Sequence, residues 1–113
     1  MTTDFIHTLQ TDPAAAYLET DAVLQSANSE EAFMAFAAKP VIVALESLAV
    51  KGIAVKSAFY DSDYGGAVAR ITLNGDCVFT DGETGTFNVI WSYSFDKEKW
   101  EVAALNVLAD RAQ

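Results

Sequence analysis

The sequence predicts an α+β fold in which helices come first and an antiparallel sheet follows. Apolar residues recur at helical spacing as far as about Val50, and from Ile53 onward they alternate with polar residues as in strands. The length of 113 residues suits a single core without disulfide support. We therefore expect residues 1–113 to form a single domain.

The first predicted helices lie in the N-terminal quarter. A helical turn is expected around Asp4–Leu9. Asp12 and Pro13 are typical of a helix start, because aspartate caps the first turn and proline fits its first position. Residues 21–26 could extend the helix that follows Pro13 or form a short strand.

The clearest predicted helix runs from Ser29 to Lys51. Asn28 and Glu31 have the spacing of a capping box, and apolar residues follow at intervals of three and four. These residues are Phe33, Phe36, Ala37, Val41, Ala44, Leu45 and Leu48. At Pro40 we expect either a kink or a break between two abutting helices, followed by an end at Gly52. The apolar stripe is expected to be buried against the sheet.

Strands are expected from Ile53 to the C-terminal region. The first covers 53–59, and the second begins near Ala67. Asn74-Gly75 could form a hairpin turn or a bulge within one long strand that reaches Thr80.

Two further strands are expected over 85–95 and 100–108. The first of them has a continuous apolar face of Phe87, Val89, Trp91, Tyr93 and Phe95. In the last strand, simple alternation puts Ala103, Leu105 and Val107 on one face and Trp100, Val102, Ala104 and Leu108 on the other. One domain can bury only one apolar face, so we expect a homodimer through the sheet, unless the C-terminal tail or a loop covers the other face.

Charge and cysteine content narrow the classes of partner. The net charge of −9 disfavours binding to nucleic acid or to an anionic membrane. It favours either simple solubility or attraction to a basic protein. Cys77 is the only cysteine, and the N-terminus lacks the pattern of a secretory signal, so we expect a cytoplasmic protein.

The segment from Ala67 to Leu108 carries a family resemblance. A strand, a glycine-flanked turn, a long strand ending in Phe-Asp and a final Trp-x-Val-x-x-Leu-x-Val strand are similar to the closing strands of the NTF2-like, or SnoaL-like, superfamily. The resemblance implies a cystatin-like α+β cone, in which helices close one end of a curved sheet around a cavity. Members include isomerases, cyclases, dehydratases and domains that only bind or dimerise.

The sequence departs from the catalytic pattern of the ketosteroid-isomerase-like branch of this family. Gln25 and Ser26 stand near the position of its general base, and Val89 and Trp91 near that of its second carboxyl group. We therefore expect a non-catalytic ligand-binding or dimerising domain. The alternatives are an enzyme that acts on a small apolar substrate, with Asp21 or Asp76 as base and a tyrosine as donor, and an acidic partner-binding or inhibitory protein.

Five side chains are candidates for contact with a small apolar ligand: Tyr17, Asp21, Arg70, Trp91 and Tyr93. Asp21 precedes an apolar run and could lie at the mouth of a cavity. Neither a metal site nor a cofactor is predicted, because His7 is the only histidine and Asp61–Gly66 lacks the ligand set of a calcium loop.

Overall fold

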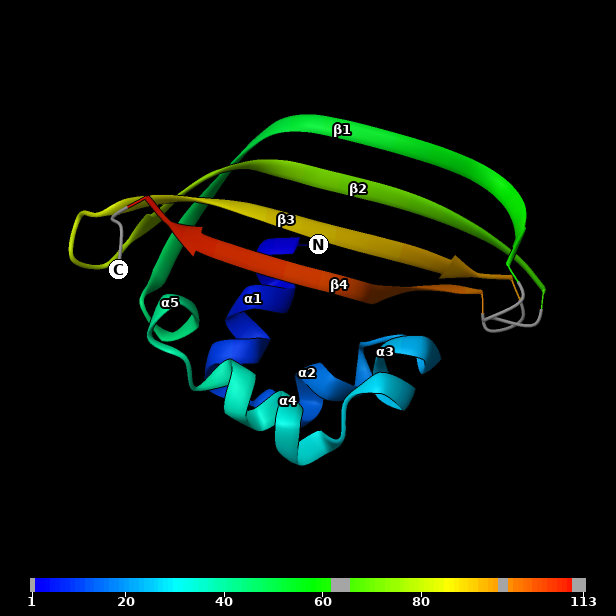
Figure 1. The fold of residues 1–113 in the computed structure, drawn as a ribbon, viewed down its shortest axis with the longest axis horizontal. Helices are drawn as coiled ribbons and strands as arrows, with labels where there is room; N and C mark the ends of the chain where they lie inside the picture. Colours follow the sequence, from blue (N-terminus) through cyan, green and yellow to red (C-terminus); the bar gives the residue numbers. More distant parts are fainter. Residues whose placement is uncertain (1, 62–65, 96–97, 111–113) are drawn as a thin grey trace.

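The described residues fold into five short helices followed by four strands (Figure 1). The computed structural model describes residues 2–61, 66–95 and 98–110. The helices are α1 (Thr2–Thr11), α2 (Pro13–Leu18), α3 (Ala22–Ala27), α4 (Glu30–Ala37) and α5 (Pro40–Val43), and the strands are β1 (Leu45–Asp61), β2 (Gly66–Phe79), β3 (Thr84–Ser94) and β4 (Lys99–Ala109). The predicted α+β class is confirmed.

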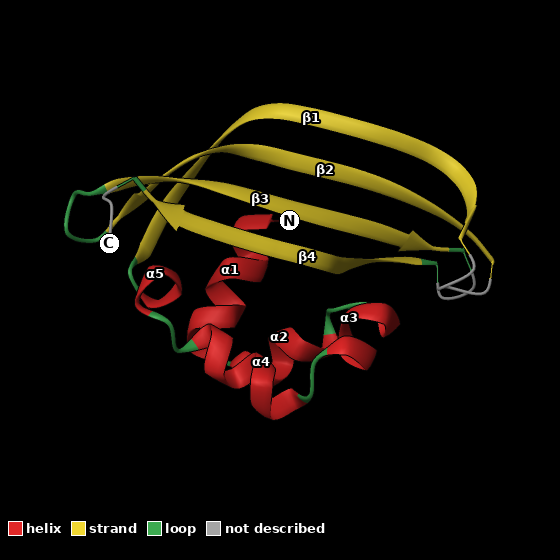
Figure 2. Ribbon diagram, viewed as in Figure 1, coloured by secondary structure: helices red, strands yellow, loops and turns green. Residues whose placement is uncertain are grey.

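The strands form one antiparallel sheet in the order β1-β2-β3-β4, so each strand pairs with its neighbours in sequence. The sheet arches over the helices, which lie on its concave face (Figure 2). The core lies between them, where Phe5 and Leu9 of α1 are buried together with Val89 and Trp91 of β3. None of the helices in the described part of the chain is long and apolar enough to cross a membrane.

The first helices begin where their capping residues predict. The carboxylate of Asp12 accepts a hydrogen bond from the N–H of Ala15 at 3.3 Å, and Pro13 occupies the first position of α2. Neither alternative for residues 21–26 is met, because α2 ends at Leu18 and α3 is a separate helix with its own cap at Asp21. Strand character is confined to Thr20, which makes a single parallel bridge to Val102 in β4.

The predicted helix from Ser29 to Lys51 is wrong in its second half. Two helices meet near Pro40, as one alternative predicted, since α4 ends at Ala37 and α5 begins at Pro40. However, α5 ends at Val43, and β1 already begins at Leu45. The start is also shifted by one residue, since Ser29, rather than Asn28, caps α4. Its side chain accepts a hydrogen bond from the N–H of Ala32 at 3.1 Å.

Two β-bulges explain why the start of β1 resembles a helix in sequence. The register between β1 and β2 shifts between Leu45 and Ser47, so Leu45 and Leu48 face the same side of the sheet despite their three-residue interval. A second register shift, at Lys51, likewise puts Val50 and Ile53 on the same side of the sheet although they are three residues apart. Three-residue intervals of apolar residues are what a helical stripe contains, so the pattern alone favoured the helix.

Asn74-Gly75 lies inside one continuous strand, as one of the two alternatives predicted. β2 passes through both residues without a turn, and the bulge lies opposite them in β1. Gly75 is required at this point because a Cβ atom there would overlap the carbonyl oxygen of Ala49 and lie 2.9 Å from the nitrogen of Lys51. The glycine therefore permits the close approach of two strands.

A bulge in β4 sets the faces of that strand. Ile90 pairs with Ala104, and Trp91 pairs with Val102, which leaves Ala103 as an extra residue. Val102 and Leu105 therefore share the concave face, and the predicted alternation that put them on opposite faces is wrong. The apolar residues of β4 are thus gathered mainly on the face that the helices cover.

Candidate functional site

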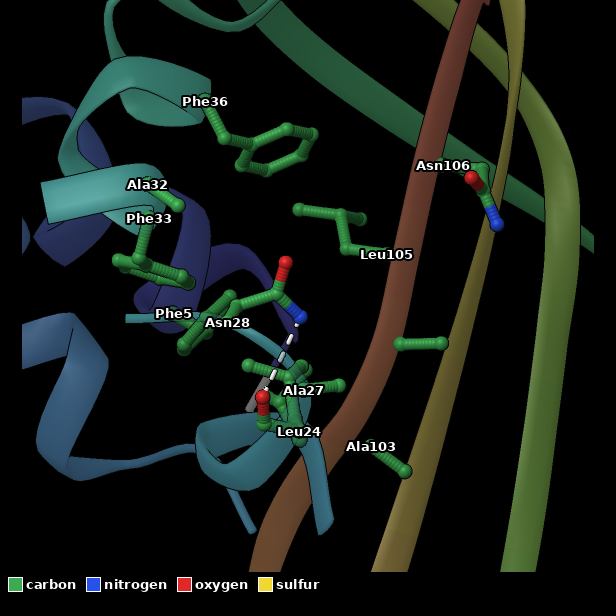
Figure 3. Close-up of a pocket in the computed structure, with 12 residues that line it drawn as sticks. Phe5, Leu24, Ala27, Asn28, Ala32, Phe33, Phe36, Ala103, Leu105 and Asn106 are labelled. Carbon is green, nitrogen blue, oxygen red and sulfur yellow. Dashed lines mark hydrogen bonds between the residues drawn. The ribbon is translucent and has the colours of Figure 1, made fainter. Parts of the chain in front are cut away.

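An apolar groove lies between helices α3 and α4 on one side and β4 on the other (Figure 3). Its volume is about 350 Å³, within the range of small-molecule binding sites. The residues that line it are Phe5, Leu24, Ala27, Asn28, Ala32, Phe33, Phe36, Val102, Ala103, Ala104, Leu105 and Asn106. The lining is thus aromatic and aliphatic apart from two asparagines.

Asp21 fixes the distance between α3 and β4. Its carboxylate accepts a hydrogen bond from the N–H of Leu24 at 2.7 Å and caps the helix. Its own backbone N–H donates to the carbonyl of Val102 at 2.9 Å. One residue therefore starts the helix that carries Leu24 and ties that helix to the strand opposite.

Tyr17 holds the connection between α3 and α4. Its hydroxyl donates to the carbonyl of Asn28 at 2.9 Å, and its ring centroid lies 5.2 Å from that of Phe33. These two contacts pack α2 against the helices that form one wall of the groove.

The aromatic residues of the groove differ in depth. Phe33 is buried, whereas Phe36 is only partly buried and packs beside it, with ring centroids 6.3 Å apart. Across the opening, the side chain of Leu105 points from β4 toward Phe36 (Figure 3). Phe36 and Leu105 therefore form opposite sides of the groove, and Phe33 lies deeper.

The chemistry of the groove is that of apolar contact. Ionisable side chains are absent from the lining of the groove as far as the described residues define it. The Asn28 amide is already engaged, since its Nδ2 donates to the carbonyl of Leu24 at 3.2 Å. A bound molecule would be held by burial of apolar surface, and the described lining supplies no group for proton transfer at neutral pH.

None of the five predicted ligand-contacting residues is part of this lining, but three of them support it. Tyr17 and Asp21 act as described above. Trp91 packs edge-on against Phe5 with ring centroids 5.9 Å apart, and its Nε1 donates to the hydroxyl of Thr2 at 3.0 Å. These residues hold the groove in shape without facing into it.

The other two candidates lie elsewhere. Arg70 pairs across the strands with Ser92, which pairs with Glu101, and this row faces away from the helices. Tyr93 lies beside Trp100, with ring centroids 5.1 Å apart. The structure therefore does not bring the five candidates together into one site.

The carboxylates considered as catalytic bases also lie apart. Asp21 is buried at the edge of β4, whereas Asp76 is half exposed on β2 with an oxygen 2.5 Å from the ammonium nitrogen of Lys51. The hydrogen bond and charge of Asp76 raise the pKa of Lys51. Asp76 is thus part of a surface ion pair on β2, whereas Asp21 caps α3.

Cys77 is a buried thiol. Burial raises its pKa, and the charges of Asp110 and Asp76 raise it further. The side chain therefore favours the neutral thiol over the nucleophilic thiolate.

Within residues 2–61, 66–95 and 98–110, no group of three or more His, Cys, Asp or Glu side chains could hold a metal ion. The turn Asp61–Gly66, considered above as a calcium loop, falls largely outside the described residues.

Comparison of the chain with family models, with curated proteins and with solved structures finds no match.

Proposed function

We propose that this chain is a small, non-catalytic binding domain of the NTF2-like, or SnoaL-like, type, and that the groove between α3, α4 and β4 is the mouth of its cone. The order of elements and the arch of the sheet over the helices support this proposal. One observation carries the binding function: a groove of about 350 Å³ has an aromatic and aliphatic lining and stays open beside Phe36.

The lining also favours binding over catalysis. An isomerase or dehydratase needs a general acid or base within hydrogen-bond reach of its substrate. The polar side chains of the described lining are Asn28 and Asn106, and neither ionises at neutral pH. An apolar ligand would gain affinity mainly from the surface that it buries.

Fluorescence of Nile red, a neutral apolar dye, tests this function. Ala32 lines the groove, so Ala32→Trp should fill it and weaken dye binding about tenfold or more. Ala35 is exposed on the same helix without lining the groove, so Ala35→Trp is the matched control and should bind like the wild type. Equal binding by the two variants, or no dye binding by the wild type, would reject the groove as a ligand site.

The homodimer remains a second proposal, and a specific surface supports it. Val50, Ile53 and Val55 of β1 are 48%, 66% and 69% exposed, and β1 is an edge strand of the sheet. Exposed β-branched residues on an edge strand favour pairing with another chain. We place the dimer contact at this margin of the sheet.

Light scattering at micromolar concentration decides this second proposal. The wild type should have the mass of a dimer, and Ile53→Lys should have that of a monomer. Ile90→Lys is the control. It makes the same substitution on β3, on the face of the sheet opposite to Ile53, and should leave the dimer intact. A monomeric wild type, or dissociation caused only by Ile90→Lys, would overturn the assignment to β1.

A further inference from the structure

The outer edge of β4 has the properties of a site for strand addition. β4 is the last strand of the sheet, so its outer edge faces no further strand among the described residues. The N–H of Asp110 donates inward to the carbonyl of Thr84 at 2.9 Å. Because the direction of backbone groups alternates in an antiparallel ladder, Leu105, Val107 and Ala109 direct their N–H and C=O groups outward.

The chain itself already uses the beginning of this edge. The N–H of Val102 donates to the carbonyl of Glu19, and the carbonyl of Val102 accepts from the N–H of Asp21, both at 2.9 Å. Thr20 thereby forms a parallel bridge to Val102. This bridge ends where Asp21 caps α3, and the outward groups of Leu105, Val107 and Ala109 lie further along the same edge.

The groove runs beside that same stretch. Its strand wall includes Ala103–Asn106, and Leu105 points across it toward Phe36 (Figure 3). A segment added to β4 would send every second side chain to the concave side of the sheet, next to this apolar lining. From Leu105 to Ala109 the edge spans five residues, about 17 Å at about 3.4 Å per residue.

The far end of the edge is acidic. A second hollow, lined by Val41, Ala44 and Ala109, is bordered by Asp81 and Glu83. Its one lysine, Lys39, lies over the ring of Phe36 with its ammonium nitrogen 5.8 Å from the ring centroid. Together with the net charge of −9, these carboxylates favour a basic side chain on whatever lies along this edge.

We propose that β4 and the groove together bind an extended peptide segment, with alternate apolar side chains in the groove and a basic residue near Asp81. The backbone of this segment hydrogen-bonds to Leu105, Val107 and Ala109, as in other complexes formed by strand addition. This inference rests on the proposed binding function and names the chemical class of the ligand.

The test uses a fluorescein-labelled octapeptide in which valine alternates with threonine over six residues and two arginines follow. Fluorescence anisotropy should show saturable binding to the full chain. Amide hydrogen exchange should slow at Leu105, Val107 and Ala109, whereas Asn106 and Leu108, whose N–H groups already face β3, should change little.

Two matched comparisons separate backbone pairing from other kinds of contact. One peptide is N-methylated at its valines and another at its threonines. Only one of these sets can donate to β4, so one methylated peptide should lose affinity about tenfold or more while the other binds nearly as before. Asp81→Asn should weaken binding of the arginine peptide, whereas Asp76→Asn, on the opposite face of the sheet, should not.

Each outcome decides the proposal. Absent peptide binding with retained Nile red binding rejects the peptide but keeps the groove as a small-molecule site, and absence of both rejects the proposed function as well. Equal effects of the two methylated peptides overturn strand addition. Protection of Leu105 and Val107 that grows with protein concentration in the absence of peptide would assign the edge to a second copy of the chain and overturn the peptide as its occupant.

Discussion

Val102 and Leu105 present their side chains to the same face of the sheet although they are three positions apart, because Ala103 is an extra residue opposite Ile90. The consequence is functional as well as structural. Val102 is buried in the core beside the bridge to Thr20, and Leu105 is aimed at the groove. Because of the bulge, side chains on a single face of β4 contribute to both the core and the groove.

Deletion of Ala103 should disrupt the fold. Without the extra residue, either Val102 and Trp100 or Leu105 and Val107 must turn to the convex face. Either pair contains one buried and one partly buried side chain. Their loss should lower the free energy of unfolding by roughly 2–4 kcal/mol, at about 1.5–3 kcal/mol for the buried one and about half of that for the other. Urea unfolding measures the change, and Ala103→Ser, which keeps the residue count, is the control. Wild-type stability after the deletion would mean that the bulge is absent in solution.

Phe33 and Phe36 should differ in their contribution to stability. Phe33 is 6% exposed, so Phe33→Ala should cost roughly 3–5 kcal/mol through lost burial and the cavity left behind. Phe36 already borders the groove, and Phe36→Ala should cost roughly half as much. Chemical denaturation of both variants provides the comparison. Equal losses would indicate that the groove is closed in solution and that Phe36 is a core residue.

The hydrogen bond between Trp91 and Thr2 should stabilise the attachment of α1 to the sheet. Thr2→Val keeps the shape of the side chain but removes the acceptor of the buried indole N–H. The expected loss is about 1–3 kcal/mol, because the N–H remains buried without a partner. Thr3→Val, at the neighbouring exposed position, should be nearly neutral in the same thermal or denaturant unfolding experiment. A neutral Thr2→Val would show that the N–H finds water or another acceptor.

Asp21 should act as a helix cap and not as a base. Asp21→Ala should lower stability by about 1 kcal/mol, whereas Asp21→Asn should retain most of it, since asparagine also caps helices. Dye binding by Asp21→Asn should match that of the wild type because the carboxylate does not line the groove. Loss of dye binding in a stably folded Asp21→Asn would instead place this carboxylate in contact with the ligand.

Cys77 should react slowly with a thiol reagent in the folded protein. Its pKa is raised mainly by burial, so less thiolate is present at a given pH, and access is restricted as well. The raised folded-state pKa also means that the neutral thiol contributes stability below the unfolded-state pKa, and this contribution is lost as pH rises through the folded-state pKa. Comparison of alkaline unfolding curves for wild type and Cys77→Ala isolates this effect, which should be missing in the variant. Rapid modification of the native thiol would contradict its burial.

The local features of the chain were predictable from sequence because they depend on neighbouring residues. Asp12 and Pro13 start α2 by satisfying backbone groups within one turn, and this requires no distant partner. The alternation of Phe87, Val89 and Trp91 in β3 likewise follows from the two-residue period of a strand with one buried face. Both features appear in the structure as expected.

The groove could not be predicted because it depends on pairing between distant segments. A bulge exists only relative to a partner strand, so nothing within Leu45–Leu48 or Val102–Leu105 distinguishes a bulged strand from a helical interval. The local pattern therefore predicts Phe36 in a longer helix and in the core, and Leu105 on the face opposite Val102. The sequence by itself determined the α+β class, the helix caps and the strand periodicity. Tertiary pairing decided where β1 begins, which face each apolar residue takes, and hence where the chain can bind, because strand register is fixed by contacts that no local segment contains.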